Sequence, residues 1–361
     1  MKKQIKLFDP VTGSQEKTAV LDVLKSKFWA SGAGTGKVLD FEKRFNNYVG
    51  STECIAVSSG TAALHLALSL IDIKNKEVIL PSLSFVSTAH AVLYNGGIPV
   101  FVDVDPKTLC IDPQMIKKSI TKRTKIILPV HLGGMPCDLD EISALCNESK
   151  ITLIEDAAHA AGTSYKNAKI GSHGKIVCFS FHPVKNLAMP TGGAITLNGN
   201  SSEKFKDILK SKRWCGISNR KGVKYDVKDL GWNYYMNEFS AAIGIEQLKK
   251  LDRLNDKRKN TAKMYYNEIE LETKMPFNRE CSYHYYWILV RNRDNFIQKL
   301  KENGIETGIH YLPIHEMKFY RGKIKLPVTE NAGKHLVSLP THPNLEQSDV
   351  DKVIKMINRF S

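Results

Sequence analysis

Three segments of this chain place polar side chains directly after apolar, strand-like runs. The first covers residues 57–64, where the small residues Ser58-Ser59-Gly60-Thr61 lead straight into a helical stretch. Unpaired backbone N–H groups and the helix dipole at such a junction both favour a phosphate, so this junction is a candidate anion site. Serine and threonine are also ordinary helix caps, and taken alone a plain cap is the simpler interpretation.

The second segment ends an apolar run with the acidic pair Glu155-Asp156. A carboxylate at the end of a buried strand is badly placed unless it has a partner. A pyridinium nitrogen would be such a partner, because an ionised Asp156 would keep that nitrogen protonated and let the ring accept electrons. The alternative is a strand-end carboxylate that faces water or caps the next helix.

The third segment, residues 179–186, carries Lys185 in a short turn that His182-Pro183 stiffens. Most lysines are solvated surface residues. A lysine held half desolvated near a bound cation would have a lowered pKa and could attack an aldehyde. Ser180, at the end of the same apolar run, could add a hydrogen bond to a phosphate.

In this order the segments resemble the DegT/DnrJ/EryC1/StrS family of sugar aminotransferases, whose members have the type I, aspartate aminotransferase-like fold. The resemblance runs from about Ser26 to the end of the chain and is specific because four motifs occur in order with the correct spacing. These motifs are Ser59-Gly60-Thr61-Ala62-Ala63-Leu64, Glu155-Asp156-Ala157-Ala158-His159, Ser180-Phe181-His182-Pro183-Val184-Lys185-Asn186 and Gly231-Trp232-Asn233-Tyr234-Tyr235-Met236-Asn237-Glu238.

The resemblance implies a pyridoxal 5'-phosphate cofactor, with pyridoxamine phosphate as the intermediate form. Lys185 would hold the cofactor as a Schiff base, and Asp156 would pair with the ring nitrogen. Phe85 would stack on the ring, although an isolated phenylalanine is more often plain core. His159 stands where the family often has glutamine and would contact the ring hydroxyl.

The same resemblance assigns the cofactor's phosphate to Gly60, Thr61 and Ser180. Asn233 would reach that phosphate from the neighbouring subunit, which implies a homodimer with shared active sites. The alternative for Asn233 is a cap on the turn before the helix that starts near Asn237.

The family reaction implied is a ping-pong transamination, in which an amino acid such as glutamate gives its amine to a nucleotide-linked keto-6-deoxy sugar. Lys185 would carry the proton between substrate carbon and cofactor carbon. His310 and Tyr311 would lie near the sugar. Arg213 and Arg220, in the basic loop 210–224, are candidates to grip the diphosphate, although a solvated loop is an equal alternative.

The wording His182-Pro183-Val184-Lys185 is similar to family members that aminate carbon 4 rather than carbon 3. Two departures concern substrate contacts. After the lysine the family usually continues Thr-Thr-Gly-Glu-Gly-Gly, whereas this chain has Ala188-Met189-Pro190-Thr191-Gly192-Gly193, without the acid. Tyr235 stands where many members have arginine.

Three other functions remain as alternatives. A sugar dehydratase on the same fold uses the same cofactor, but such relatives replace the lysine with histidine, and Lys185 is present. A non-catalytic regulator on this fold is disfavoured by intact Lys185 and Asp156. A nucleic-acid-binding module would suit the net charge of +15, but the basic residues are spread along the chain and no such motif occurs.

Composition narrows the class further. Apolar residues make up 42% and charged residues 25% of the 361 positions, as in ordinary globular proteins. No apolar run reaches the roughly 18 residues of a membrane span, and the basic start lacks a signal-peptide core, so we expect a cytoplasmic protein without membrane contact. The seven cysteines are scattered and suit neither disulfides nor metal, and most are expected to be buried. The glycine-rich residues 32–38 lack the spacing of a P-loop.

The elements that must position these residues follow a βαβ rhythm. Helical segments and apolar runs follow one another in turn along the chain. Within each run the residues are continuously apolar rather than alternately polar and apolar, which predicts an α/β fold with a mostly parallel sheet. The runs are residues 78–80, 100–104, 126–130, 151–154 and 177–181. A long helical stretch from Asn237 to about Tyr266 then leads to a mixed α+β part. We therefore predict a large cofactor-binding domain, residues 1–245, and a smaller C-terminal domain, residues 246–361.

Overall fold

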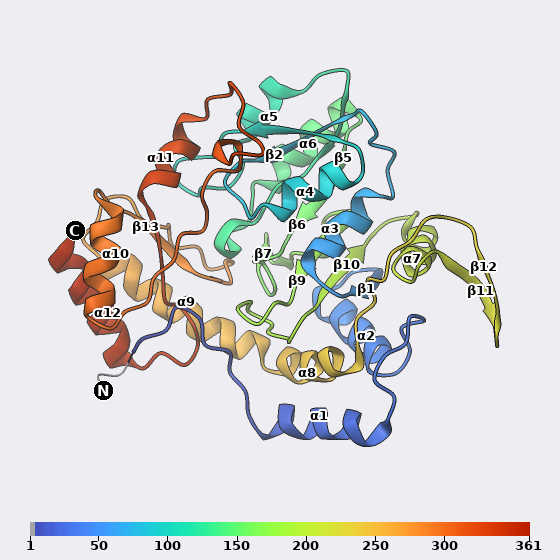
Figure 1. Ribbon diagram of the computed structural model, residues 1–361. Coiled ribbons are helices and arrows are strands. Elements are labelled where there is room, and N and C mark those ends of the chain that lie inside the picture. The colour runs from blue at the N-terminus through green and yellow to red at the C-terminus, as the bar shows by residue number, and fades with distance from the viewer. Residues whose placement is uncertain (1–3) are drawn as a thin grey trace.

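The computed structural model describes residues 4–361, and Figure 1 shows the arrangement of its elements. The strands are β1 (Glu53–Val57), β2 (Glu77–Pro81), β3 (Ile98–Val102), β4 (Thr124–Ile127), β5 (Thr152–Leu153), β6 (Glu155–Asp156), β7 (Ser164–Tyr165), β8 (Ala168–Lys169), β9 (Ile176–Ser180), β10 (Gly193–Leu197), β11 (Ile217–Lys221), β12 (Lys224–Val227), β13 (Tyr286–Leu289) and β14 (Leu336–Leu339).

The helices alternate with these strands over the first half of the chain. They are α1 (Ser14–Ser26), α2 (Lys37–Val49), α3 (Gly60–Leu68), α4 (Ser87–Tyr94), α5 (Pro113–Ser119), α6 (Leu139–Ser149), α7 (Ser202–Lys212), α8 (Glu238–Lys249), α9 (Leu251–Glu268), α10 (Arg293–Glu302), α11 (Pro327–His335) and α12 (Gln347–Phe360). Two single turns of 3-10 helix are η1 (Leu132–Gly134) and η2 (Ile314–Glu316).

One mixed sheet organises the larger part of the molecule. Its strand order is β3-β2-β4-β5 continuing into β6-β9-β10-β1, because β5 and β6 follow one another along the chain. A parallel bridge between Val130 and Asp156 carries the pairing from the β4 side onto β6. Within the described residues only β10 runs against its neighbours, pairing antiparallel with β9 and β1. The predicted mostly parallel sheet is confirmed.

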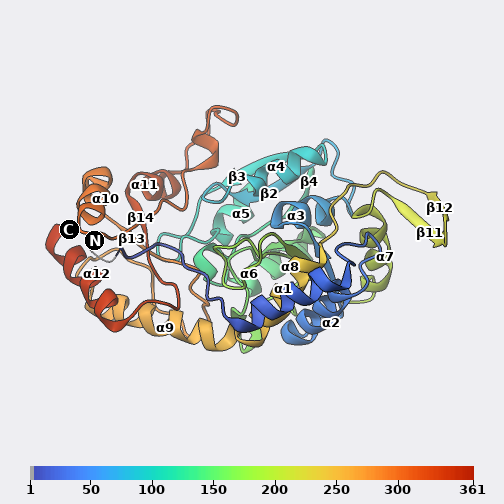
Figure 2. The same cartoon turned by 60° about the horizontal axis from the view of Figure 1, so that its bottom comes forward.

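Helices cover both faces of this sheet (Figure 2). Alternate residues of a strand point to opposite faces, so Ile55 and Val57 pack with α3, α4 and α7 while Cys54 and Ala56 pack with α2, α6 and α8. Burial on both sides explains why the strands read as continuous apolar runs rather than as alternating ones.

The predicted runs correspond to β2, β3, β4, β5 and β9, with ends displaced by up to about three residues. The long helix expected from Asn237 to Tyr266 is two helices, α8 and α9, which part at Lys250. Beyond α9, strands β13 and β14 pair antiparallel and lie among α10, α11 and α12, so the C-terminal part is α+β as predicted.

The N-terminal segment lies against this C-terminal part. Ile5 N–H donates to the Gly304 carbonyl at 2.8 Å, and Glu306 N–H returns a bond to the Ile5 carbonyl at 2.9 Å. Further along, the carbonyl of Lys6 accepts from His342 Nε2 at 3.0 Å. The predicted division assigned these first residues to the large domain, whereas their contacts join them to the smaller part. The boundary near residue 245 stays a prediction.

Within residues 4–361, no helix combines the length and apolarity that crossing a membrane requires. Cys215 is exposed, and the other six cysteines are buried without disulfides, as the sequence predicts for most of them.

Asp103, just beyond the end of β3, fastens the sheet to α11. Its carboxylate accepts from Val328 N at 3.0 Å, Thr329 N at 2.7 Å and Thr329 Oγ1 at 2.7 Å. These N–H groups belong to the first turn of α11, where no carbonyl within the helix is available to them. The carboxylate therefore caps a helix of the C-terminal part from the sheet, and its charge complements the helix dipole.

We predict that Asp103→Ala lowers the free energy of unfolding by about 1–2 kcal/mol, the usual loss for a removed helix cap. Urea unfolding followed by fluorescence would measure this change. Asp103→Asn keeps one acceptor oxygen and should lose less. An unchanged urea midpoint in Asp103→Ala would contradict the capping role.

Candidate active site

A cavity of about 310 Å³ lies at the edge of the sheet where the parallel strands end. Strands β1, β2, β6 and β9 all finish there, because parallel strands present their carboxyl ends to one edge. Strand β10 runs the other way and so begins at this edge. The predicted residues in its wall are Gly60, Thr61, Phe85, Asp156, His159, Ser180, Lys185, His310 and Tyr311. Asn233, Arg213 and Arg220 are the predicted residues outside it.

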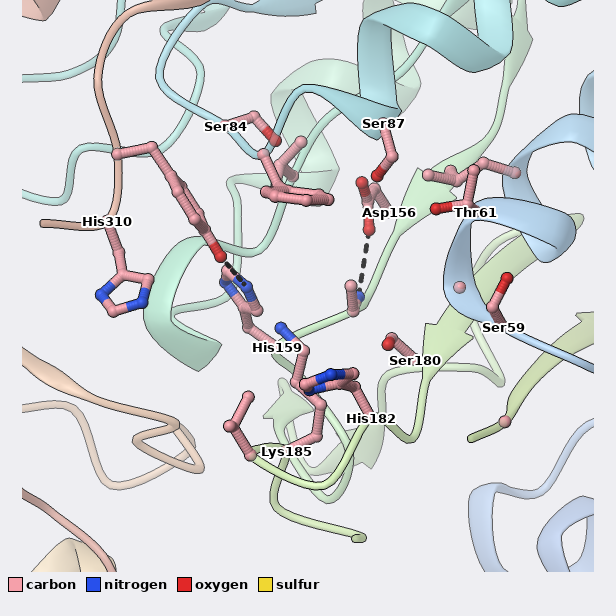
Figure 3. Close-up of a pocket in the computed structure, with 18 of the residues that line it drawn as sticks. Ser59, Thr61, Ser84, Ser87, Asp156, His159, Ser180, His182, Lys185 and His310 are labelled. Atoms are coloured by element: carbon pink, nitrogen blue, oxygen red, sulfur yellow. Dashed lines mark hydrogen bonds between the residues drawn. The ribbon is translucent and has the colours of Figure 1, made fainter. Parts of the chain in front are cut away.

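The phosphate-binding turn predicted from the sequence forms one end of this cavity (Figure 3). Ser59 caps α3, with its hydroxyl accepting from Ala62 N–H at 3.1 Å. The N–H groups of Gly60 and Thr61, the two residues before Ala62 in the same first turn, have no acceptor inside the helix and lie at the positive end of its dipole. The Ser59 cap occupies the N–H of Ala62 and leaves those of Gly60 and Thr61. The capping role is therefore compatible with an anion bound at the same turn.

Close packing makes glycine necessary at two positions around this turn. A Cβ atom at Gly60 would meet Cβ of Ser180 at 2.7 Å. At Gly193, the first residue of β10, it would meet the backbone of Ser59 at 2.5 Å. The absence of side chains lets β9 and β10 approach α3, which brings the Ser180 hydroxyl to the same end of the cavity as Thr61.

Asp156 is buried at the end of β6, with 3% of its surface exposed. Its Oδ1 accepts from Ala158 N–H at 3.1 Å, and its Oδ2 accepts from the Thr88 hydroxyl at 2.9 Å. Burial raises the pKa of Asp156, while these two hydrogen bonds and the charge of Lys185 oppose that rise. A positively charged ring nitrogen in the cavity would offset the free-energy cost of burying the ionised carboxylate of Asp156.

Thr88 and Ser84 are supporting residues that the sequence analysis missed. Because Thr88 donates its proton to Asp156, its oxygen is free to accept from the Ser84 hydroxyl at 2.8 Å. The four-residue spacing of Ser84 and Thr88 at the start of α4 is the only signal in the sequence, and it points equally well to a helix cap.

Lys185 reaches the same cavity from the turn after β9, and its side chain is half-buried (Figure 3). Its own N–H donates to the His182 carbonyl at 2.8 Å, which closes the predicted turn. Burial lowers the pKa of Lys185 to about 7, although the charge of Asp156 acts in the opposite direction. Near neutral pH a large fraction of the amine is therefore unprotonated and nucleophilic.

Phe85 is not a core residue, because 54% of its surface is exposed although it follows a buried strand. Its ring lines the cavity and lies 5.8 Å from that of Tyr311, centroid to centroid. An open aromatic face at this position suits stacking on a flat ligand.

His159 differs in its contacts from the role expected of it. Its Nδ1 accepts from Gly133 N–H at 3.2 Å, and its Nε2 lies 3.0 Å from the Tyr311 hydroxyl. Both ring nitrogens are thus engaged within the protein, and His159 and Tyr311 lie side by side in the cavity wall.

Arg213 requires a correction. It was expected to grip the substrate diphosphate, but it is fully buried, and its Nη1 pairs with Glu42 at 2.5 Å and with the Ala56 carbonyl at 2.8 Å. A guanidinium that fixes α2 to β1 in the core is not available to substrate. The basic composition of loop 210–224 concealed this, since the residue's partner lies 171 positions away.

Arg220 and Asn233 lie on the surface away from this cavity. Arg220 belongs to the β11–β12 hairpin and stacks over the ring of Trp214, at 5.0 Å from its centroid. Asn233 is exposed, and its backbone pairs with that of Trp214 in an antiparallel bridge. Neither residue lines the cavity of its own chain.

The altered segment after the lysine keeps the shape of the site. Met189 is buried and fills space that a Cβ atom on Gly244 would occupy, at 2.1 Å from the Met189 methyl carbon. Thr191 lines the cavity and donates its hydroxyl to the Ser58 carbonyl at 2.5 Å. This chain therefore has a neutral hydroxyl, tied to the phosphate-binding turn, where the resemblance leads one to expect a carboxylate.

The fold and the cavity together define a type I pyridoxal-phosphate enzyme. The sequence profile of the DegT/DnrJ/EryC1/StrS aminotransferase family matches residues 10–358, and the chain belongs to this family. It is a pyridoxal-phosphate-dependent aminotransferase, and the predicted family, fold class, enzyme class and cofactor are confirmed.

Individual relatives agree with this assignment. The uncharacterized protein MJ1066 of Methanocaldococcus jannaschii is 35% identical over 98% of this chain and 96% of its own. The putative sugar aminotransferase Spr1654 of Streptococcus pneumoniae, in its PLP form, is similar with a TM-score of 0.93 and 26% identity, over 99% of this chain and 98% of that one. PseC of Helicobacter pylori, an aminotransferase of pseudoaminic acid biosynthesis, gives a TM-score of 0.92 and 28% identity, over 99% of both chains.

The residues present fit pyridoxal phosphate. The free N–H groups of Gly60 and Thr61 suit its phosphate, and the buried carboxylate of Asp156 suits a protonated ring nitrogen. The open face of Phe85 suits the ring, and the desolvated amine of Lys185 suits the aldehyde. These individual roles stay predictions.

We predict that the rate at which Lys185 reacts with added pyridoxal phosphate falls as the pH is lowered through about 7. Below this pKa the amine is protonated and cannot attack, whereas an ordinary exposed lysine would show a midpoint near about 10.4. Stopped-flow absorbance on cofactor-stripped protein would measure the profile. Because the charge of Asp156 raises the pKa of Lys185, Asp156→Asn should move the midpoint lower. A midpoint above 9 would contradict the desolvated amine.

Proposed function

We propose that this enzyme moves an amino group from glutamate to carbon 4 of a nucleotide-linked keto-6-deoxy sugar. Transamination of a sugar follows from its family and from its likeness to the sugar aminotransferases named above. The main structural support for this reaction is that Lys185 and Asp156 line the same cavity, at the carboxyl ends of β9 and β6. We further propose a cytoplasmic location, as expected from the sequence.

Bound pyridoxal phosphate supplies an electron-accepting ring that stores the amino group between the two half-reactions. The carboxylate of Asp156, which Thr88 holds through its hydroxyl, would keep the proton on the ring nitrogen. Lys185 Nζ, whose pKa of about 7 lets it both take and give a proton at neutral pH, moves the proton between substrate carbon and cofactor carbon. Phe85 excludes water from one face of the ring.

Retained Lys185 also separates this function from its alternatives. A nucleophilic amine at position 185 is not expected in a dehydratase on this fold, whose relatives have histidine there. A lysine with a lowered pKa is not expected in a non-catalytic regulator, because such shifts are typical of catalytic sites.

The cavity of a single chain lacks cations for a diphosphate. Among residues 4–361, Lys185 is the one lysine in its wall, and no arginine lines it. The β11–β12 hairpin projects from the molecule (Figures 1 and 2) and carries Arg220, Lys221 and Lys224. We propose that in a homodimer this hairpin brings these cations to the partner's cavity, where they would hold the nucleotide diphosphate.

Exposed apolar residues around the hairpin support such a dimer. Val223 is 89% exposed and Leu230 is 73% exposed, and Tyr225 and Val227 lie on the strand between them. A free hairpin with this much apolar surface is unusual in a monomer. Asn233, which follows the hairpin, would then approach the partner's phosphate-binding turn.

We predict that Lys185→Ala lowers turnover by at least about 10²-fold and abolishes the covalent adduct that borohydride fixes in the wild-type enzyme. Peptide mass spectrometry after reduction would locate the adduct. Lys175→Ala, at an exposed lysine shortly before β9, is the matched control and should behave as wild type. An adduct that persists on another lysine in Lys185→Ala would contradict the assignment of Lys185 as the residue that binds the cofactor covalently.

A second prediction concerns subunit sharing. Co-expressing Lys185→Ala chains with Asn233→Ala chains should restore about a quarter of the wild-type activity, because half of the dimers are mixed and each has one intact site. Differently tagged chains would allow the mixed dimer to be isolated and assayed. No recovery in the mixed dimer would mean that Asn233 acts within its own chain, whereas full activity of the Asn233→Ala homodimer would mean that Asn233 has no role in the site.

The acceptor is identified by measuring glutamate-dependent amination of UDP-, GDP- and dTDP-linked 4-keto and 3-keto sugars. The proposal expects turnover with one nucleotide class and with the 4-keto form. Preference for a 3-keto sugar would overturn the assignment to carbon 4 but leave the transamination intact.

A further inference from the structure

The contact between His159 and Tyr311 has a definite direction. The backbone N–H of Gly133, in η1, donates to His159 Nδ1 at 3.2 Å, so Nδ1 must present its lone pair. Burial, together with the charges of Lys185 and His310, holds the pKa of His159 well below its usual range. A neutral imidazole that accepts at Nδ1 carries its proton at Nε2.

It follows that His159 donates to Tyr311. Nε2 lies 3.0 Å from the Tyr311 hydroxyl oxygen, which therefore acts as acceptor in this bond. A phenol has one proton, and here it cannot be shared with His159. Among residues 4–361, this hydroxyl makes no other hydrogen bond.

Tyr311 lines the cavity, and its hydroxyl stays protonated. Burial and the nearby charge of Asp156 raise the pKa of Tyr311, so the phenol does not ionise at neutral pH. Its backbone is fixed from the neighbouring residue, because the His310 carbonyl accepts from the Tyr285 hydroxyl at 3.3 Å and His310 Nδ1 lies 3.0 Å from the Ser338 hydroxyl. The ring lies beside Phe85 in the cavity wall.

We propose that Tyr311 donates a hydrogen bond to an oxygen atom of the molecule bound in the cavity, and that His159 is the positioning residue that fixes the direction of this donation. The proposal rests on the proposed function, since it requires the cofactor to occupy this cavity. The sequence led us to expect that His159 contacts the ring hydroxyl of the cofactor. In this proposal Tyr311, which is hydrogen-bonded to His159, makes the contact with the bound molecule. The oxygen is either the ring hydroxyl of the cofactor or the keto oxygen of the sugar.

A glutamine at position 159 would keep the polarity of this contact. A glutamine amide has one acceptor, which would take the Gly133 N–H, and one donor, which would reach Tyr311. Histidine in its Nε2-protonated form has the same arrangement. A residue with neither group would leave the hydroxyl of Tyr311 free to turn away from the cavity.

The test uses Tyr311→Phe, His159→Gln and His159→Leu in the holoenzyme, together with the double variant Tyr311→Phe/His159→Leu. Two measurements are made: the pH midpoint of the resting cofactor absorbance, and the rate constant of the sugar half-reaction as a function of sugar concentration in single-turnover experiments. Loss of one neutral hydrogen bond should weaken the affected step about 3- to 10-fold. Thermal unfolding of each variant checks that the fold is intact.

The proposal expects Tyr311→Phe and His159→Leu to show the same loss, His159→Gln to retain wild-type values, and the double variant to lose no more than either single one. A shift in the resting absorbance midpoint identifies the cofactor oxygen as acceptor. A loss confined to the sugar half-reaction identifies the keto oxygen. Unchanged values in Tyr311→Phe, or losses that add in the double variant, would overturn the proposal.

These outcomes are separable from failure of the proposed function. If Lys185→Ala retains its adduct or the enzyme binds no cofactor, the function itself is wrong. If the adduct forms normally at Lys185 and Tyr311→Phe alters neither quantity, only the role of Tyr311 is wrong.

Discussion

The site depends on keeping two groups of opposite charge out of water in the same cavity. Burial pushes Lys185 and Asp156 toward their neutral forms, while each partly restores the charge of the other. A ligand with a cationic ring and an aldehyde relieves both, because it offers Asp156 a counter-charge and Lys185 a bond. The surrounding structure limits the exposure of this pair and holds it at the same edge of the sheet as the phosphate-binding turn.

The sheet supplies that fixed geometry. Strands β1, β6 and β9 run in one direction, so the turn at Gly60, the carboxylate of Asp156 and the amine of Lys185 all emerge at one edge although they lie far apart in sequence. The reversed β10 then returns through Gly193, whose missing side chain permits close contact with the turn. The direction of the strands therefore determines that the phosphate-binding turn, Asp156 and Lys185 meet at one site.

Much of this could be predicted from the sequence, because continuous apolar runs and junctions of small residues are local signals. Phe85 and Lys185 were placed correctly in the cavity, whereas Arg213 was not, because its partner Glu42 is distant and charge alone does not reveal burial. The tautomer of His159 was equally out of reach, since it is set by the backbone of Gly133 on another segment. Pattern and composition specify which residues meet but not the direction of the hydrogen bonds between them.

The attachment of the first residues to the last third of the chain has a consequence for synthesis. Ile5 finds its partner at Gly304, so a nascent chain must carry its N-terminal segment unpaired while some 300 further residues are made, about 15–60 s at about 5–20 residues per second. Contacts of such long sequence separation form late and slowly. The sheet of the large part can therefore assemble first, and the smaller part closes only once Gly304 has emerged from the ribosome and can meet Ile5.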